Sequence, residues 1–208
     1  MSGEEFERSV SGAEEFERSI SAGGVVVFPA DTVYGLACDP EDGAAVERLY
    51  RLKGREPTKP AAVMMFDVEH ALAALPELGP RTRAALERIL PGPLTVLLPN
   101  PLGRFPLACG PAPGTVGLRV PRLEALAGVR LPVLQSSANL AGGADARRLD
   151  EVPEPIRAGA DLVIDGGELP GTPSTVVDLR RYEDGGGWGV ARTGAVPYME
   201  LAEALNAK

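Results

Sequence analysis

The stretch that decides the fold runs from Gly24 to Pro60 and opens with GVVVFPADTVYGL at residues 24–36. Its apolar run, Val25 to Phe28, lies between a glycine and a proline, which is typical of a short, fully buried strand. Pro29 cannot donate a hydrogen bond to a neighbouring strand, so we expect regular pairing to stop there. Three polar residues follow at once: Asp31, Thr32 and Tyr34. Polar groups just past a buried strand are where open α/β sheets bind ligands.

A cationic loop ends the same stretch. Three cations fall within seven residues and are separated by glycine and proline: Lys53, Arg55 and Lys59. Arginine can grip a phosphate through paired donors, whereas lysine acts as a point charge. Glycine and proline favour a shaped loop over one face of a helix. A polar turn after a strand is common in α/β proteins, and a cationic loop is usually only a solvated surface. The two motifs in succession favour a phosphate-binding site.

Composition limits the classes of protein that this chain can belong to. Its 208 residues are 44% apolar, so we expect one large domain with an ordinary core. The formal net charge of −8 argues against a general affinity for nucleic acid but allows a local basic pocket. No apolar run reaches the roughly 18 residues of a membrane span, and the acidic amino terminus lacks a signal-peptide pattern. We therefore expect a soluble, cytoplasmic protein without a membrane partner.

The first twenty residues contain a ten-residue repeat, EEFERSV at 4–10 and EEFERSI at 14–20. Their apolar residues roughly follow helical spacing: Phe6, Val10, Ala13 and Ile20. This spacing predicts an amphipathic helix that packs on the sheet.

Periodicity and punctuation predict the other elements. Further strands are expected at 61–66, 94–98, 115–120, 132–135, 162–164, at the end of 171–178 and at 190–194. Helices are expected at 44–52, 67–75, 80–90, 151–158 and 198–205, with Asp67 as a cap and Pro80 in a first turn. Residues 99–114 are rich in proline and glycine and predict a long loop.

Four polar clusters are expected at strand ends, at residues 31–34, 53–59, 136–139 and 174–175. Arg119 and Arg192 add cations from strands, and Thr115 shares a strand face with Arg119. Serine and asparagine are also common helix caps, and a strand face with threonine and arginine is also typical of a solvated surface. If the clusters converge, they suit a polyphosphate plus a carboxylate better than a neutral ligand.

In these segments the sequence resembles the YrdC-like family of threonylcarbamoyl-AMP synthases, from about residue 20 to 195. The matching segments are 28–36, 53–55 with 59–60, 91–95, 115–119, 137–139, 165–167, 174–178 and 192–194. The resemblance implies a single α/β domain over residues 1–208. The implied fold is a twisted mixed sheet flanked by helices, YrdC-like (DHBP-synthase-like), with a deep electropositive cavity. The chain is similar to the short form, without the extra carboxyl-terminal domain.

The resemblance implies a reaction that joins L-threonine, bicarbonate and ATP into threonylcarbamoyl-adenylate and releases pyrophosphate, for the t6A37 modification of tRNA. The product would pass to a separate tRNA threonylcarbamoyl transferase complex, with at most a weak contact to tRNA. Mg²⁺ would arrive with ATP, held by the phosphates, and no permanently bound metal is expected.

The resemblance also assigns roles to residues. It places ATP against Arg55, Lys59, Thr115, Ser137 and Arg192. It places L-threonine against Thr32, Arg119 and Ser174. It implies catalytic roles for Lys53, Arg55, Ser137 and Asn139, of which Lys53 and Arg55 would neutralise charge on the α-phosphate and the leaving pyrophosphate.

Departures from the family pattern leave two alternatives open. Ala30 stands where many relatives carry a hydroxyl residue, Met64 where histidine is frequent, and Pro173 where an acidic residue is common. Because Ala30 and Met64 are expected near the threonine subsite, a paralogue that acts on another amine is one alternative. The other is a module that binds structured RNA, which the net charge and only five phenylalanines disfavour.

Overall fold

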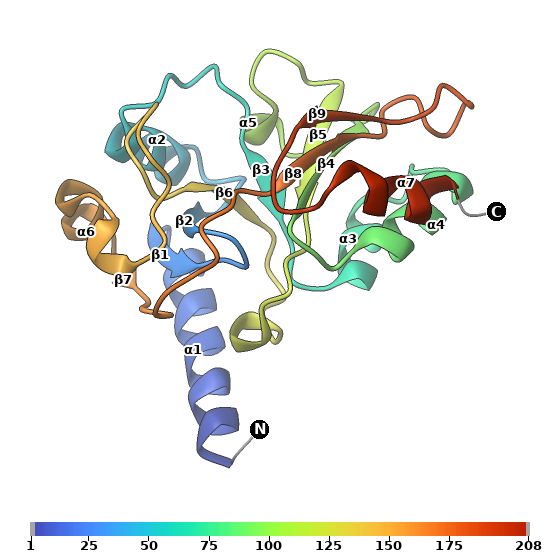
Figure 1. Ribbon diagram of the computed structural model, residues 1–208. Coiled ribbons are helices and arrows are strands. Elements are labelled where there is room, and N and C mark those ends of the chain that lie inside the picture. Colours follow the sequence, from blue (N-terminus) through green and yellow to red (C-terminus); the bar gives the residue numbers. More distant parts are fainter. Residues whose placement is uncertain (1–2, 207–208) are drawn as a thin grey trace.

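The computed structural model describes residues 3–206, with side chains described from residue 12 onwards. Within that range, one mixed sheet holds nine strands in the order β7-β1-β2-β6-β3-β5-β4-β8-β9 (Figure 1). The strands are β1 (Val26–Pro29), β2 (Tyr34–Cys38), β3 (Ala62–Met64), β4 (Leu94–Pro99), β5 (Thr115–Arg119), β6 (Val133–Ser137), β7 (Leu162–Val163), β8 (Thr175–Asp178) and β9 (Gly189–Arg192). The helices are α1 (Gly3–Ser21), α2 (Gly43–Lys53), α3 (Val68–Ala74), α4 (Pro80–Ile89), α5 (Pro106–Cys109), α6 (Glu154–Gly159) and α7 (Tyr198–Asn206), with short 3₁₀ turns η1 (Glu124–Leu126) and η2 (Leu149–Glu151).

The first two strands form a hairpin around the opening motif. Pairing of β1 with β2 ends at Pro29 opposite Tyr34, which confirms the predicted stop at the proline. The tight turn between them closes through a hydrogen bond from the Ala30 amide to the Val33 carbonyl, 3.4 Å long. The sequence analysis missed β2, because this turn lacks the Asn-Gly or Asp-Gly pair that usually marks a hairpin.

Alternation along the strands divides the core between the two faces of the sheet. One face carries the larger apolar cluster, which includes Leu36, Val63, Leu118, Leu134 and Val177 and is covered by helices α2 to α7. The opposite face carries a smaller cluster in which Phe28, Ala37, Met64 and Val133 pack beneath α1. Because α1 covers only one end of this second face, the rest of the face is free to bind a ligand.

Helix α1 anchors its end of the sheet through one aromatic side chain. Phe16 is fully buried and meets Phe28 and Phe66 edge to face, with ring centroids 5.4 Å and 5.6 Å apart. Ala13 and Ile20 are buried as predicted, and the predicted positions Phe6 and Val10 lie outside the described side chains. Among the described side chains, the packing surface of this helix comes from the second copy of the repeat and Ala13.

The other predicted elements are present with small shifts in their ends. Asp67 caps α3 by accepting a 3.0 Å hydrogen bond from the His70 amide, and Pro80 stands in the first turn of α4. The predicted loop at 99–114 was wrong in one respect, because α5 forms within it. Among the described residues, none of the helices has the length and apolarity that crossing a membrane requires.

Candidate functional site

A hollow of about 200 Å³ lies on the part of the sheet face that α1 leaves uncovered. Polar and charged side chains dominate its lining, which includes three arginines and one aspartate. The lining residues are Thr32, Val33, Arg55, Pro60, Ala61, Ala62, Thr95, Arg119, Gln135, Ser136, Ser137, Asp145, Pro173, Ser174, Val176 and Arg192. Segments from four distant parts of the chain therefore meet here, as the sequence analysis expected.

The floor of this hollow is the sheet itself, although the sequence analysis expected the site at strand ends. Ala62, Arg119 and Gln135 line the hollow, whereas their chain neighbours Val63, Leu118 and Leu134 lie in the core on the other face. Gly117 lies opposite Ala62 in the pairing of β5 with β3. Small residues at these positions keep side chains from filling the space above the strands.

An ion pair closes the end of the hollow beside the β1–β2 turn. Arg119 Nη2 donates to Asp31 Oδ1 over 2.7 Å, and the two side chains are only 5% and 6% exposed. Arg119 also donates to Thr32 Oγ1 at 3.3 Å and to Gln135 Oε1 at 3.1 Å. Burial lowers the pKa of Arg119 and raises that of Asp31, so each ion depends on the other for its charge.

A second arginine lies across the hollow, near the other edge of the sheet. Arg192 Nη2 donates to the Ser174 carbonyl at 2.7 Å and to Ser174 Oγ at 3.1 Å. Ser174 Oγ in turn lies 2.9 Å from Thr95 Oγ1. These contacts fix the guanidinium and two hydroxyls at one place, which suits the oxygens of an anionic ligand.

The third arginine comes from the cationic loop after α2. Arg55 Nη2 donates to the Pro60 carbonyl, and its guanidinium lies over the Tyr50 ring, 5.8 Å from the centroid. The Tyr50 hydroxyl donates to the Lys59 carbonyl at 2.9 Å. Tyr50 therefore shapes the loop so that Arg55 points into the hollow, while the side chain of Lys59 is exposed.

Lys53 lies behind the hollow and holds the turn after β6. Its ammonium group is buried and donates to the carbonyls of Ser137 and Asn139, and to Asn139 Oδ1 at 2.8 Å. Ser137 Oγ donates to the same Asn139 Oδ1 at 2.7 Å, and Asn139 Nδ2 donates to Gly143 at 2.7 Å. All three ammonium protons thus have protein acceptors. Lys53 and Asn139 lie outside the lining and act on it through Ser137.

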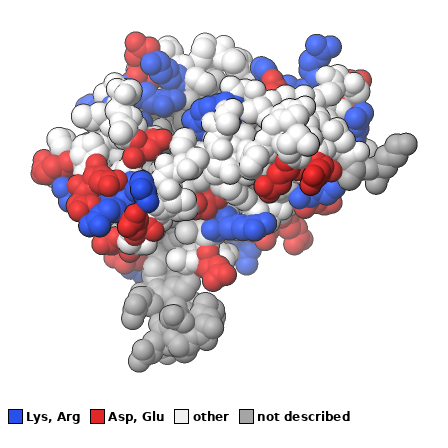
Figure 2. Space-filling view, in the orientation of Figure 1, with Lys and Arg blue, Asp and Glu red and all other residues white. Residues whose placement is uncertain are grey.

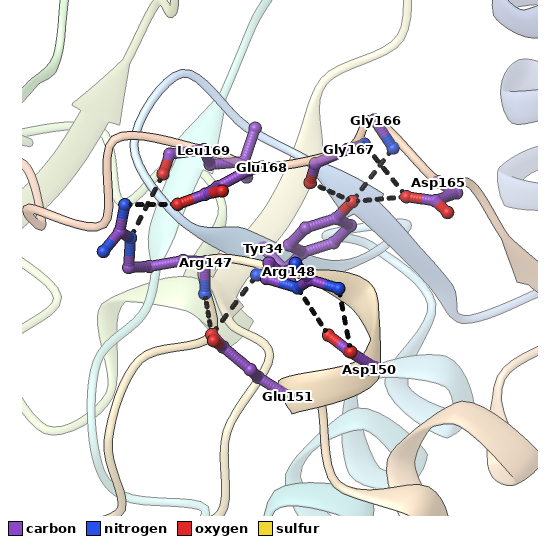
Figure 3. A network of polar contacts seen from close by, with 10 residues as sticks. All are labelled: Tyr34, Arg147, Arg148, Asp150, Glu151, Asp165, Gly166, Gly167, Glu168 and Leu169. Carbon is purple, nitrogen blue, oxygen red and sulfur yellow. Dashed lines mark hydrogen bonds and ion pairs between the residues drawn. The ribbon is translucent and has the colours of Figure 1, made fainter.

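Tyr34 takes part in a separate polar network on the other face of the sheet (Figure 3). Its hydroxyl lies 2.8 Å from Asp165 Oδ1 and 2.9 Å from the Gly167 carbonyl, and it accepts a hydrogen bond from the Gly166 amide at 2.9 Å. Burial raises its pKa to about 12, so the hydroxyl stays protonated. The Asp165-Gly-Gly motif therefore fastens Tyr34, and the expectation that Tyr34 faces the ligand pocket was wrong.

The backbone around Tyr34 links this network to the hollow. The Tyr34 amide donates to the Ala146 carbonyl at 2.9 Å, directly after Asp145, which lines the hollow. Arg147 pairs with Glu168 at 2.7 Å and binds the backbone of Leu169 (Figure 3). The segment at 145–151 is therefore held by strand β2 through Tyr34 and by residues 168–169 through Arg147.

Six of the ten predicted site residues line the hollow: Thr32, Arg55, Arg119, Ser137, Ser174 and Arg192. The other four, Lys53, Lys59, Thr115 and Asn139, are absent from the lining among the described residues. Ala30 and Met64, expected near the amino-acid subsite, are buried in the cluster beneath α1, and Met64 lies opposite Arg119 in the pairing of β3 with β5. The sequence analysis missed Thr95, Gln135 and Asp145, and only the strand alternation at Gln135 could have indicated its direction.

The family model with the description "Telomere recombination", which covers the Sua5, YciO and YrdC proteins, matches residues 18–194. The chain belongs to the Sua5/YciO/YrdC family. A family member from Stutzerimonas stutzeri, named threonylcarbamoyl-AMP synthase, is 36% identical over 78% of this chain and 89% of its own length. One of the same name from Pyrococcus abyssi is 31% identical over 88% of this chain and 54% of its own length.

Solved structures of family members have the same fold. P. abyssi Sua5, solved in complex with L-threonine, superposes with a TM-score of 0.81 at 28% identity, over 96% of this chain and 57% of that one. E. coli YciO superposes with a TM-score of 0.75 at 25% identity, over 93% of both chains. The chain thus spans little more than half the length of its archaeal relative and nearly all of YciO. The predicted single α/β domain with a mixed, helix-flanked sheet is confirmed.

Proposed function

We propose that this protein is a threonylcarbamoyl-AMP synthase, which forms threonylcarbamoyl-adenylate and pyrophosphate from L-threonine, bicarbonate and ATP. The observation that carries the proposal is the convergence of Arg55, Arg119 and Arg192 with three serines in one hollow. Asp31 neutralises Arg119 and Asp145 is the one aspartate in the lining, so the three guanidinium groups still leave a positive charge that suits an anionic ligand. The threonylcarbamoyl-AMP synthases among the relatives and the threonine complex of P. abyssi Sua5 support the choice of substrates.

The nucleotide would bind along the side of the hollow formed by Arg55, Ser137 and Arg192. Arg55 and Arg192 would neutralise charge on the phosphates, and the Ser137 hydroxyl would turn its proton from Asn139 Oδ1 to a phosphate oxygen. The resemblance also assigns Lys59 and Thr115 to ATP. Neither residue is among the described residues that line the hollow, so they would contact the part of ATP that extends beyond it. Lys53 and Asn139 would position Ser137.

The amino acid would bind at the other end of the hollow, near Thr32 and Arg119, with Ser174 across from them. Arg119 would receive the carboxylate, because its charge is held in place by Asp31 and its remaining N–H groups are free of described partners. The carboxylate would thus be fixed while the amine stays open to reaction.

The chemistry then needs no side-chain nucleophile. The threonine amine attacks bicarbonate, forms a carbamate C–N bond and releases water. A carbamate oxygen attacks the α-phosphorus of ATP in line, a new P–O bond forms, and the bond to pyrophosphate breaks. Holding the reactants together supplies much of the acceleration, and the arginines stabilise the charge that moves to the leaving group.

Threonine-dependent release of pyrophosphate is the expected result when the protein is incubated with ATP, bicarbonate and L-threonine. The measurement is phosphate release through a coupled pyrophosphatase, with labelled bicarbonate to detect the adenylate. Omission of threonine or of bicarbonate serves as the control, because each supplies atoms of the product. Release at the same rate without threonine would contradict the proposal, and release only with another amine would identify a paralogue.

A role as an RNA-binding module has less support. Figure 2 shows basic and acidic side chains interspersed on the face viewed, and the net charge of the chain is −8. Nonspecific affinity for RNA depends on many cations that displace counterions. Tight, salt-dependent tRNA binding in a filter-binding assay, without ATP turnover, would favour this alternative. The synthase proposal itself includes transfer of the product to a separate transferase complex.

The Mg²⁺ that accompanies ATP can be held with help from Asp145. Among the described residues, no cluster of three or more histidine, cysteine, aspartate or glutamate side chains could hold a metal ion. Mg²⁺ often binds through a single carboxylate plus phosphate oxygens and water. Asp145 is the carboxylate in the lining, so it fits this arrangement.

We expect Asp145→Asn to lose most of the effect of Mg²⁺ on nucleotide binding. If Mg²⁺ tightens ATP binding to the wild-type protein, the variant should show an effect smaller by about tenfold, which corresponds to the loss of one metal contact of ~1.4 kcal/mol. Calorimetric titration of ATP with and without Mg²⁺ measures this directly. Glu56→Gln is the matched control, since Glu56 lies on the cationic loop outside the lining. An equal loss of affinity with and without Mg²⁺ would point to a contact with the nucleotide itself.

A further inference from the structure

Gln135 stands out in the floor of the hollow because its neighbours are small. It lies on β6, opposite Ala37 of β2 and Ala62 of β3. Gly35, two residues before Ala37 on β2, lies close to it as well, because a methyl group there would come within 3.0 Å of Gln135 Nε2. Gln135 is 4% exposed and lines the hollow. The Gln135 side chain thus fills the space that its small neighbours on β2 and β3 leave above the sheet.

The orientation of the Gln135 amide follows from its partner. Arg119 Nη1 lies 3.1 Å from Oε1, and a guanidinium group can only donate hydrogen bonds. The amide oxygen must therefore face Arg119, and the NH₂ group faces away from it. No described residue accepts a hydrogen bond from Nε2. A buried amide with unused donors gains most from an acceptor on a ligand that excludes water.

Gln135 also limits how Arg119 can move. The guanidinium is held on one side by Asp31 and Thr32, and on the other by Gln135. The three partners come from the β1–β2 turn and from β6, so they fix both ends of the guanidinium plane. Loss of the Gln135 contact would free Nη1, the end of the guanidinium group that Gln135 holds.

Ala30 and Met64, the positions expected near the amino-acid subsite, are not among the described residues that line the hollow. Both are buried in the cluster beneath α1, and the hollow meets that cluster at Gln135, opposite Ala37, and at Arg119, opposite Met64. Ala37, Met64 and Val133 of the buried cluster lie on the same sheet face as Gln135 and next to it in the strands. Shortening this side chain would therefore extend the hollow toward the core.

We infer that Gln135 is the specificity-determining residue of the amino-acid subsite, which limits the substrate side chain by its bulk and orients Arg119 toward the substrate carboxylate. This inference rests on the proposed function. Bulk and hydrogen bonding are two separate contributions, and substitutions at Gln135 can separate them. Alanine removes both, methionine keeps the length without the hydrogen bond, and glutamate keeps the shape but adds a second carboxylate beside Arg119.

The experiment measures pyrophosphate release by wild-type protein, Gln135→Ala, Gln135→Met and Gln135→Glu with serine, threonine, valine and leucine. For Gln135→Ala we expect kcat/KM with threonine to fall about tenfold or more, and the ratio of leucine to threonine to rise about tenfold. Gln135→Met should keep the wild-type size preference and bind threonine about tenfold more weakly. Gln135→Glu should weaken threonine binding more than Gln135→Met does, because its carboxylate competes for Arg119.

Threonine binding without nucleotide, measured by calorimetry, and ATP binding without threonine provide readouts other than turnover. ATP affinity should be unchanged in all three variants. Leu134→Met is the control for disturbance of β6, since Leu134 points into the core on the other face. Unaltered size preference in Gln135→Ala, with wild-type threonine affinity, would overturn the inference. Absence of threonine-dependent turnover in the wild-type protein would instead defeat the proposed function.

Discussion

Replacing Lys53 by methionine is expected to abolish turnover and to lower the free energy of unfolding by on the order of 3 kcal/mol. The physical reason is that the ammonium group serves three acceptors on one turn: the carbonyls of Ser137 and Asn139 and the Asn139 side chain. Methionine fills a similar volume but removes the Lys53 donor from the two carbonyls, a loss of about 1–3 kcal/mol for each, while Asn139 Oδ1 keeps its hydrogen bond from Ser137 Oγ. The turn would then shift, and the Ser137 hydroxyl would leave the hollow.

Urea denaturation and the pyrophosphate assay measure the two effects. Lys59→Met is the matched control for stability, because Lys59 lies six residues further along the same loop with an exposed side chain. Its unfolding free energy should change by less than about 0.5 kcal/mol. Equal stability of the two variants would show that the ammonium group does not hold the turn.

The pH dependence of stability gives a second test of the same lysine. Burial, together with the charge of Arg55, lowers the pKa of Lys53 to about 8. Its pKa in the unfolded chain is about 10.5, so between these values the unfolded state binds more protons. The free energy of unfolding of the wild-type protein should therefore rise, relative to Lys53→Met, as the pH increases from about 8 to about 10.5. A difference that stays flat across this window would contradict the lowered pKa.

The sequence predicted the elements well where the apolar periodicity agrees with glycine, proline or capping residues at the ends of the element. The strand after Gly24 and the helix that starts at Pro80 have clear apolar patterns and clear ends. Strand β2 was missed because YGLAC also reads as part of a polar turn followed by a short loop. Its identity as a strand depends on pairing with β6, a hundred residues further along, which no local pattern reveals.

The sequence indicated many of the residues of the candidate site but not where on the sheet the site lies. Thr32, Arg55 and Arg192 lie together as expected, but over the face of the sheet and not at the strand ends. Which face is open depends on where α1 stops, and that is a property of the packed molecule. Lys53 was interpreted as a phosphate ligand because the sequence gives its charge but does not indicate that its side chain is buried.

The ion pair between Asp31 and Arg119 could not be predicted for the same reason. The two residues are 88 positions apart, and nothing in the local sequence of either one indicates the other. The sequence analysis assigned Arg119 to the substrate carboxylate alone. Its observed contact with Asp31 means that this cation is neutralised before any substrate arrives, so its loss affects the folded state as well as the reaction.

Arg119→Met is expected to destabilise the protein by about 3–5 kcal/mol, because it leaves the Asp31 carboxylate buried without its partner. Asp31→Asn should cost less than Arg119→Met, since the amide oxygen can still accept from the guanidinium. The double variant should be more stable than the sum of the single losses predicts, as the unpaired charge is then absent. Urea denaturation at pH 7 of the four proteins gives this coupling energy directly.

Turnover separates the structural role of Arg119 from its role toward substrate. Both Arg119→Met and the double variant should lose threonine-dependent pyrophosphate release, because the double variant restores stability without restoring the cation. Arg148→Met is the control for removal of an arginine from an ion pair. Its pair with Asp150 is more than half exposed, so less than about 1 kcal/mol should be lost. Activity of the double variant near the wild-type rate would remove Arg119 from the substrate site, and additive losses of stability would show that the pair contributes no coupling in the folded protein.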